Sequence, residues 1–407
     1  MKDRDSVSLG IWFNVGGRYE EKANKGAAHF LEHIVFKGSR HYSCEKIKQT
    51  VEGVGGSLNA FTAEEQTCFY AKTPSKHLRS AFDVLADMVF FPRIQARDVA
   101  KEKTVIIEEI KMYRDLPQYH VMEQLDGMVW PGHPLGQSIA GTIESVGRTT
   151  REDLRDFHRN YYGPSNALIA ACGNVDHDTL KAMAVSKLSK VSCGKSRAFK
   201  AVQSAPSQAQ LKIEKRKIEQ KHLALGMRAF DQHSHERFAL ALLNVILGGN
   251  MSSRLFVEVR EKHGLAYSIS SSVKLLDDTG MFMVRAGVDN TRLVKALELI
   301  VKELEKICRS GVKENEFKRA RDYLLGQLVL GLEDTMEHML WMGESVMIRE
   351  RIRTLKEIIS RFKKVPLAQI KKVAKEVLKP SCFNLSLVGP VSDAQRKRIR
   401  TLIGVPN

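Results

Sequence analysis

The two halves of this chain repeat one order of strands, helices and glycines at an offset of about 210 to 216 residues. The alternating segment 7–11 has a counterpart at 223–227, and each contains one glycine, Gly10 or Gly226. Two longer segments, 151–173 and 367–389, each combine an expected helix, a Pro-Ser pair and an apolar strand. A repeat of this length predicts two homologous α+β domains and excludes a short-period solenoid.

Composition places the boundary between the two domains near residue 200. Residues 190–210 are polar and basic and contain Pro, Ser and Gln, which is typical of a linker. We therefore expect a first domain over 1–189 and a second over 211–407. With 407 residues, of which 43% are hydrophobic, the chain is long enough to form two full cores.

A largely apolar helix predicted over 26–36 carries three titratable side chains, His29, Glu32 and His33. The histidines are four residues apart, so their imidazoles lie on one face of the helix, and Glu32 shares that face. Two imidazoles with a nearby carboxylate can hold a divalent metal ion and activate a water molecule. The order H-x-x-E-H is the inverse of the H-E-x-x-H zinc motif. The alternative is a buried amphipathic helix with incidental histidines, but burial of unpaired titratable groups is costly.

A further ligand is expected from the charged helix predicted over 96–114. Glu102 and Glu109 are seven residues apart and lie nearly on one face, whereas Glu108 points about 100° away. One of the two glutamates could complete the metal site, and the other could hold a ligand imidazole. The helix over 238–247, which matches the histidine-bearing helix, has no His or Glu at the ligand positions. The metal is therefore expected in the first domain alone.

The net charge of +17 is consistent with a solvated basic surface or with binding to nucleic acid or an anionic surface. Basic residues gather over 195–221 and near the C-terminus without any nucleic-acid motif. This favours the solvated surface, and we expect no nucleic-acid partner.

Cysteine spacing and hydropathy bear on the compartment. The six cysteines are scattered without C-x-x-C spacing, which predicts reduced thiols in a cytoplasmic protein. The first residues lack the apolar core of a signal peptide, and no apolar run reaches the roughly 18 residues of a membrane span.

These residues resemble the zinc peptidases of the pitrilysin, insulysin and mitochondrial-processing-peptidase group. In that family H-x-x-E-H is followed, about 76 residues after the second histidine, by a metal-binding glutamate, a spacing that ends at Glu109. The resemblance implies one Zn²⁺ per chain, bound by His29, His33 and Glu109. It assigns the general base to Glu32 and the orientation of the ligands to Glu102. It also implies mainly antiparallel sheets packed by helices.

The resemblance extends to the second half, where Arg-Glu-Lys-His-Gly-Leu-Ala-Tyr matches a family segment over 260–267. Its Arg and Tyr, here Arg260 and Tyr267, reach the active site in the family and are counted there with the catalytic groups. A cation and a phenol can donate to charge that develops in a transition state. The alternative is an ordinary helix end capped by Gly264, with Tyr267 at the start of a strand.

A strand expected over 57–62 also resembles the family, in which it lies at a sheet edge and the substrate adds to it as a further strand. The substrate-binding residues implied are Asn59, Ala60 and Phe61. Main-chain pairing of this kind accepts many side chains. Family members usually have an additional strand before the one at residue 6, so either the start of this sequence is truncated or the first sheet is one strand short and exposes an edge.

Together these features predict a zinc metalloendopeptidase that hydrolyses peptides or unfolded protein segments inside a dimeric chamber. A homodimer is the simple expectation because one chain carries both half-sites, and a heterodimer with a homologous chain stays possible. The basic charge would bias such an enzyme toward acidic or neutral peptides. The alternatives are a non-catalytic assembly subunit of a related complex and a basic nucleic-acid-binding protein with an incidental metal site.

Overall fold

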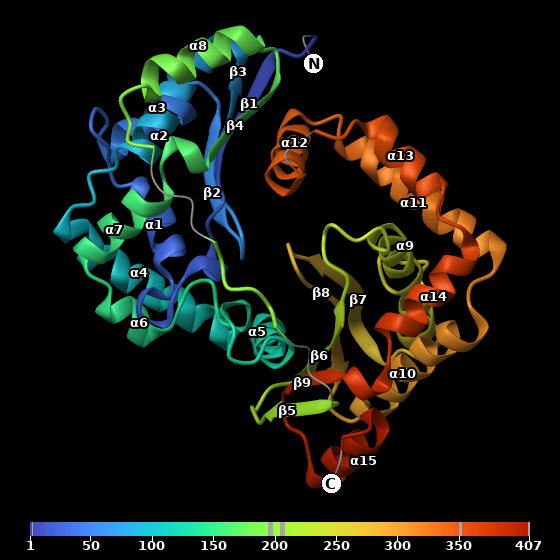
Figure 1. The fold of residues 1–407 in the computed structure, drawn as a ribbon. Helices are drawn as coiled ribbons and strands as arrows, with labels where there is room; N and C mark the ends of the chain where they lie inside the picture. The colour runs from blue at the N-terminus through green and yellow to red at the C-terminus, as the bar shows by residue number, and fades with distance from the viewer. Residues whose placement is uncertain (2, 194–197, 204–207, 350–351, 406–407) are drawn as a thin grey trace. The chain divides into compact units, whose positions relative to one another are not determined.

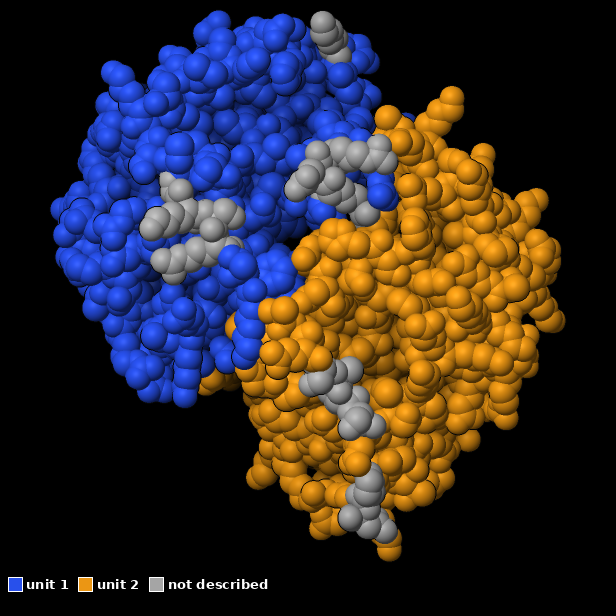
Figure 2. Space-filling model, in the orientation of Figure 1, with its two compact units in different colours: residues 1–111, 137–200, 329–353 blue, residues 112–136, 201–328, 354–407 orange. Residues whose placement is uncertain are grey.

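The computed structural model describes residues 1, 3–193, 198–203, 208–349 and 352–405. The chain forms two compact units, coloured separately in Figure 2. Unit 1 contains residues 1–111, 137–200 and 329–353, and unit 2 contains 112–136, 201–328 and 354–407. The predicted linker, 190–210, lies partly outside the described residues, at 194–197 and 204–207.

Unit 1 is built on a four-stranded antiparallel sheet with the order β2-β3-β1-β4 (Figure 1). Its strands are β1 (Ser6–Phe13), β2 (Ser57–Thr62), β3 (Thr67–Pro74) and β4 (Ala167–Gly173). Its helices are α1 (Ala27–Val35), α2 (Cys44–Glu52), α3 (Leu78–Phe90), α4 (Ala96–Asp115), α6 (Ile143–Arg148), α7 (Arg151–Tyr161), α8 (His177–Leu188) and α12 (Thr335–Arg349), with short 3₁₀ turns at Gly17–Tyr19, Lys22–Asn24, Ser75–His77 and Pro164–Asn166.

Unit 2 is built on a five-stranded sheet with the order β5-β9-β6-β8-β7. Its strands are β5 (Gln210–Glu214), β6 (Gln220–Ala229), β7 (Ala266–Leu275), β8 (Gly280–Asp289) and β9 (Asn384–Val388). Its helices are α5 (Pro117–Val129), α9 (Arg237–Leu247), α10 (Leu293–Ser310), α11 (Glu314–Gly331), α13 (Leu355–Lys363), α14 (Leu367–Val377) and α15 (Asp393–Ile403), with a π-helical turn at Phe256–Lys262 and 3₁₀ turns at Pro134–Gly136 and Pro380–Cys382.

The predicted α+β class with two related, mainly antiparallel sheets is confirmed. Strands β6, β8, β7 and β9 of unit 2 match β1, β3, β2 and β4 of unit 1, in the same spatial order. The fifth strand, β5, pairs in parallel with β9. Among the described residues no strand takes the corresponding place beside β4.

Side chains alternate along β1 between the two faces of its sheet. In β1, Leu9, Ile11 and Phe13 point into the core formed with α1, α3 and α7. Trp12 points to the opposite face, where α12 covers it and Met339 packs nearby. Alternation with period two therefore gives unit 1 one large core and a second, smaller apolar layer on the other side.

The compact units are not the two continuous halves of the chain, because each half gives one helix to the other unit. Helix α12, from the second half, covers the sheet of unit 1. Helix α5, from the first half, packs through Val121, Leu125 and Val129 on the sheet of unit 2. The exchange is reciprocal and follows the sequence repeat. The boundaries 1–189 and 211–407 stay a prediction about that repeat.

Two glycines at matching positions of the repeat leave space for helices α12 and α5 to pack on the sheets. A Cβ on Gly10 would lie 2.3 Å from the Trp12 ring and 2.8 Å from Met339 Sδ. A Cβ on Gly226 would lie 2.9 Å from both Cδ atoms of Leu125. A larger residue at either place would require these side chains to shift. Among the described residues, no helix is long and apolar enough to cross a membrane.

Candidate metal centre

Helix α1 is held at its N-terminus by a buried carboxylate. The side chain of Glu20 accepts hydrogen bonds from the backbone N–H groups of Gly26, at 2.9 Å, and Ala28, at 2.8 Å. Lys25 Nζ lies 3.1 Å from the same carboxylate. Burial raises the pKa of Glu20, against the influence of Lys25 and the two amides. Because the first amides of a helix lack partners within it, this contact determines where α1 starts and which way it points.

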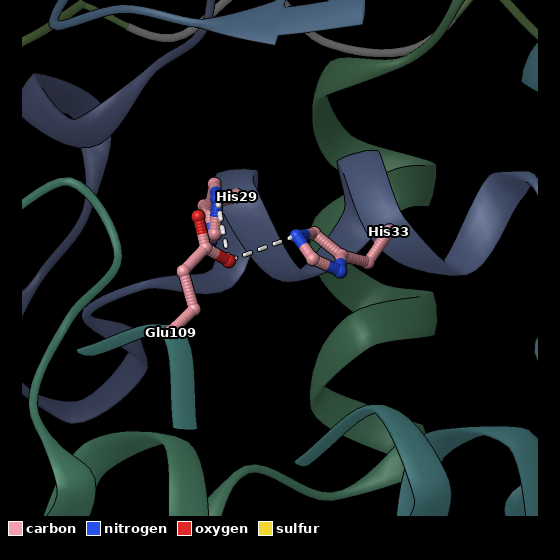
Figure 3. A group of neighbouring side chains, drawn as sticks. All are labelled: His29, His33 and Glu109. Carbon is pink, nitrogen blue, oxygen red and sulfur yellow. Dashed lines mark ion pairs between the residues drawn. The ribbon is translucent and has the colours of Figure 1, made fainter. Parts of the chain in front are cut away.

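The two histidines of α1 face one glutamate of α4 (Figure 3). Glu109 Oε2 lies 3.4 Å from His33 Nε2 and 3.8 Å from His29 Nε2. One donor atom from each residue lies within 4.8 Å of the other two. Donors about 2.0–2.1 Å from a tetrahedral zinc ion are about 3.4 Å apart, so the three side chains fit that metal. Among the described residues this is the one such group of three.

Glu102 contacts Nδ1 of His33, whereas Glu109 lies near Nε2 of the same ring. Its Oε2 lies 3.2 Å from Nδ1 of His33, and its Oε1 lies 2.7 Å from Nζ of Lys37. Glu102 itself is buried, whereas Lys37 is partly exposed. A carboxylate on the second nitrogen of an imidazole sets the tautomer that leaves Nε2 free to bind a metal. Of the two roles that the sequence left open, the geometry fits Glu102 to the supporting one.

The surroundings of His29 and His33 shift their pKa values in opposite directions. Burial, together with His33, lowers the pKa of His29 to about 4, so His29 is neutral at pH 7 and able to ligate. Burial lowers the pKa of His33, but the carboxylates of Glu109 and Glu102 outweigh it and raise that pKa above its ordinary value. The hydrogen bond with His33 lowers the pKa of Glu109.

Glu32 lies on the same helix face and contacts the end of strand β2. Thr62 Oγ1 donates a hydrogen bond to Glu32 Oε2 at 2.5 Å. Burial raises the pKa of Glu32, while the bonds from Thr62 and the charge on His33 act in the opposite direction. A carboxylate with a raised pKa beside a metal site is suited to take up and return a proton.

Strand β2, which ends at Thr62, is an edge strand of its sheet. Asn59, Ala60 and Phe61 lie on it opposite Tyr70, Phe69 and Cys68 of β3. The Asn59 side chain accepts a hydrogen bond from the N–H of Ala60 at 2.8 Å. That amide is therefore already occupied within the strand, and a peptide that pairs with it has to displace the side chain of Asn59.

Arg260 and Tyr267 lie together in unit 2, on irregular backbone. Arg260 is in the π-helical turn, a form that is frequent at functional sites. Tyr267 lies at a shift of register between β7 and β8, and 75% of it is exposed. The Arg260 guanidinium lies 5.7 Å from the centre of the Tyr267 ring. A bulge of this kind turns a side chain away from the sheet.

Three residues of the site were not among the sequence-based candidates: Glu20, Lys37 and Thr62. Lys37 lies four residues after His33, just beyond the end of α1, and this spacing is a usable signal. Thr62 follows the edge-strand residues but reaches Glu32 only through the fold. Nothing in the spacing of Glu20 points to the start of α1.

Comparison with known proteins places two family profiles along the chain. The family profile described as insulinase (peptidase family M16) matches residues 2–143, and the one described as peptidase M16 inactive domain matches residues 148–324. The chain is 36% identical over 406 residues to an uncharacterized zinc protease of Streptomyces coelicolor, covering 98% of this chain and 88% of that protein. It is 34% identical over 386 residues to the uncharacterized zinc protease YmxG of Bacillus subtilis, covering 95% and 93%.

Two solved structures share the fold. The crystal structure of a protease from Helicobacter pylori has a TM-score of 0.88 at 21% identity and covers 95% of each chain. A peptidase M16 inactive domain from Pseudomonas fluorescens has a TM-score of 0.89 at 20% identity, covering 96% of this chain and 94% of that one.

Proposed function

Since the chain belongs to the insulinase family of peptidases, family M16, we propose that it is a zinc-dependent endopeptidase acting on peptides or unfolded protein segments. One observation carries the proposal: His29, His33 and Glu109 converge on one point, with Glu32 on the same helix face. The relatives named zinc proteases support the choice of metal.

In this proposal His29, His33 and Glu109 hold one zinc ion per chain, and Glu102 keeps His33 in the ligating tautomer. When bound, zinc supplies Lewis acidity and makes a water molecule easier to deprotonate. Glu32 takes the proton of that water and returns it to the leaving amine. Thr62 occupies one oxygen of Glu32, which leaves the other oxygen for the proton.

Substrate binding is proposed at the edge strand. An extended peptide pairs with the free edge of β2 near Asn59, Ala60 and Phe61, after Asn59 releases the amide of Ala60. The groups proposed to bind the substrate carbonyl are Arg260 and Tyr267. Their mutual contact and the exposure of Tyr267 support this role, because both side chains are available to a ligand.

We further propose that two copies enclose a chamber and that Arg260 and Tyr267 act on the partner's metal centre. Complementation tests this arrangement. We expect Glu32→Gln and Arg260→Ala each to inactivate the proposed homodimer. In a mixed dimer one site keeps both Glu32 and Arg260 only if they come from different chains. Recovered activity in the mixture supports action in trans. A mixture that stays inactive contradicts it.

The experiment that tests the function is hydrolysis of a quenched, unstructured peptide of about 20 residues, long enough to lie along an edge strand. We expect the wild-type protein to cleave it, and Glu32→Gln to bind zinc without cleaving it. Glu109→Gln should lose both zinc and activity. A wild-type protein that binds zinc and cleaves no peptide would instead favour an assembly subunit, the alternative that the inactive-domain match keeps open.

A further inference from the structure

A cavity of about 320 Å³ opens on the sheet of unit 2, beside helix α5. Its polar lining consists of Arg260, Arg285, His222, Ser268, Ser270 and Gln118. Neither Asp nor Glu is among the lining residues. A volume of this size accommodates a small ligand or one side chain of a peptide. The cavity therefore combines a suitable size with positive charge.

Strand register explains why these side chains meet. Arg285 of β8 lies opposite Ser270 of β7 and Ala224 of β6, and Gly287, two residues later, lies opposite Ser268 and His222. Because side chains alternate along a strand, these positions share one face. A Cβ on Gly287 would lie 3.2 Å from Ser268 Oγ, so glycine keeps the floor of the cavity open.

Neither Arg260 nor Arg285 pairs with a carboxylate in the part of the chain that the structure describes. Arg285 Nε donates to Ser270 Oγ at 3.0 Å, and its Nη1 lies 3.7 Å from Met122 Sδ, a weak acceptor. Arg260 stacks on the rings of Phe256 and Tyr267. Within the described ranges, the structure shows no ion pair for either guanidinium. Two guanidinium groups without a carboxylate partner, at the same cavity, indicate a place for an anion.

The remaining lining groups suit a hydrogen-bonding ligand. Ser268 and Ser270 offer hydroxyl groups that donate or accept. Burial lowers the pKa of His222, so its imidazole is neutral at pH 7 and adds a donor or acceptor without further charge. Strand β7 is an edge strand of this sheet, so an extended chain can pair alongside the cavity.

We propose that this cavity is a carboxylate subsite, in which the guanidinium of Arg285 binds an acidic group of the peptide substrate. The proposal rests on the proposed peptidase function and gives it a preference, for peptides that carry an acidic group. An arginine fork matches a carboxylate in two parallel hydrogen bonds, which a lysine does not do. The carboxylate can belong to an Asp or Glu side chain or to the free C-terminus of a peptide.

Binding to the inactive Glu32→Gln protein, loaded with zinc, tests the subsite without cleavage. The probes are fluorescein-labelled peptides of one sequence with Glu or Gln at a single internal position, each with a free or an amidated C-terminus. We expect the best carboxylate-bearing peptide to bind about tenfold more tightly than the peptide with neither group, as measured by anisotropy. The pair that shows the difference identifies the side chain or the C-terminus as the source.

Substitutions in the Glu32→Gln background assign the effect to Arg285. Arg285→Gln should abolish the discrimination, Arg285→Lys should keep only part of it, and Arg285→Glu should favour a peptide with Lys at the same position. Arg319→Ala, which removes an exposed arginine of α11, is the control for net charge and should keep the full difference. Circular dichroism establishes that each variant is folded.

Two results overturn the proposal: equal binding of all four peptides, or the same loss of discrimination in Arg319→Ala as in Arg285→Gln. Reversal by Arg285→Glu supports it even if Arg285→Gln binds peptides poorly in general. Hydrolysis by the wild-type protein tests the proposed peptidase function separately. A protein that cleaves nothing but discriminates through Arg285 keeps the subsite and loses the peptidase assignment.

Discussion

The hydroxyl of Thr62 donates a 2.5 Å hydrogen bond to Oε2 of Glu32. This bond joins the end of edge strand β2 to the helix that carries the two histidines. It connects the strand proposed to bind the substrate with the carboxylate proposed to accept a proton. A peptide that pairs with β2 therefore meets the general base at a position already determined by that strand.

Removal of the Thr62 hydroxyl should slow catalysis more than it weakens substrate binding. A hydrogen bond to a charged group contributes about 1.5–3 kcal/mol, so we expect Thr62→Val to lower kcat by about 10- to 100-fold. KM should change little, because the strand keeps its main chain. Thr62→Ser, which keeps the hydroxyl, should restore most of the activity, and Ser57→Ala at the exposed start of β2 should match wild type. Wild-type kcat in Thr62→Val would refute the positioning role.

Glu102 is expected to control metal affinity through His33. Replacing the carboxylate by the amide in Glu102→Gln weakens both the bond to His33 Nδ1 and the ion pair with Lys37. Losing such a supporting partner typically reduces metal affinity by about 10- to 100-fold. Competition with a chromophoric chelator measures the zinc affinity directly, without reference to activity.

Glu108→Gln is the matched control for that experiment. Glu108 lies on the same helix, points to solvent and pairs with Lys111 at 2.7 Å. An exposed pair of this kind contributes little. Zinc affinity in Glu108→Gln should equal that of wild type. If Glu102→Gln and Glu108→Gln bind zinc equally well, Glu102 has no part in holding the ligand.

The sequence predicts the local parts of this site well and the long-range parts poorly. Helix α1 and the shared face of His29 and His33 follow from helical spacing, and the pairing of β2 with β3 follows from alternation. Choosing Glu109 as the ligand required the family spacing, because Glu102 lies on the same face of α4. The contact of Thr62 with Glu32 spans thirty residues and depends on how a strand packs against a helix.

Two further features depend on packing that no local pattern encodes. Helices α5 and α12 look like ordinary amphipathic segments, and only the complete sheets show that each covers the other half's strands. The bulge that exposes Tyr267 arises from a shift in register with β8. Register is determined by the partner strand, so a single-strand pattern cannot indicate it.

Asp87 should make the stability of unit 1 depend on pH in the acid range. Burial alone would raise the pKa of Asp87, but hydrogen bonds from Ser39, His41 and Lys187 outweigh it and lower that pKa to about 2. The folded value lies below the ordinary value of 3.8, so the carboxylate stabilises the fold above pH 4. That contribution, about 2 kcal/mol, is lost as the pH falls from about 4 to about 2.

Comparison with Asp87→Asn isolates this contribution. The difference in unfolding free energy between wild type and Asp87→Asn should be constant from about pH 5 to 7. It should shrink below about pH 4, as the contribution of the carboxylate is lost. Asp156→Asn, at an exposed position of α7, should show little gap at any pH. Urea unfolding at a series of pH values provides the measurement. A gap that stays unchanged down to about pH 2 would contradict the assignment.

Gly226 should contribute to the packing of α5 on the second sheet, because a Cβ there would lie 2.9 Å from both Cδ atoms of Leu125. Overpacking a core contact typically costs about 1–3 kcal/mol, and we expect Gly226→Ala to destabilise the protein by that amount in urea unfolding. Gly326→Ala is the matched control. Its Cβ meets nothing within 4 Å on helix α11, so better helix propensity should stabilise by up to about 1 kcal/mol.

A double-mutant cycle separates the clash from any other effect of the new methyl group at residue 226. Leu125→Ala alone leaves a cavity and should cost about 2–5 kcal/mol. In that background Gly226→Ala should cost much less than in wild type, because the atoms it would displace are gone, and the coupling should exceed about 0.5 kcal/mol. Additive effects would instead mean that Gly226 is needed for its own backbone in β6, and that the seating of α5 on the sheet does not depend on the missing side chain.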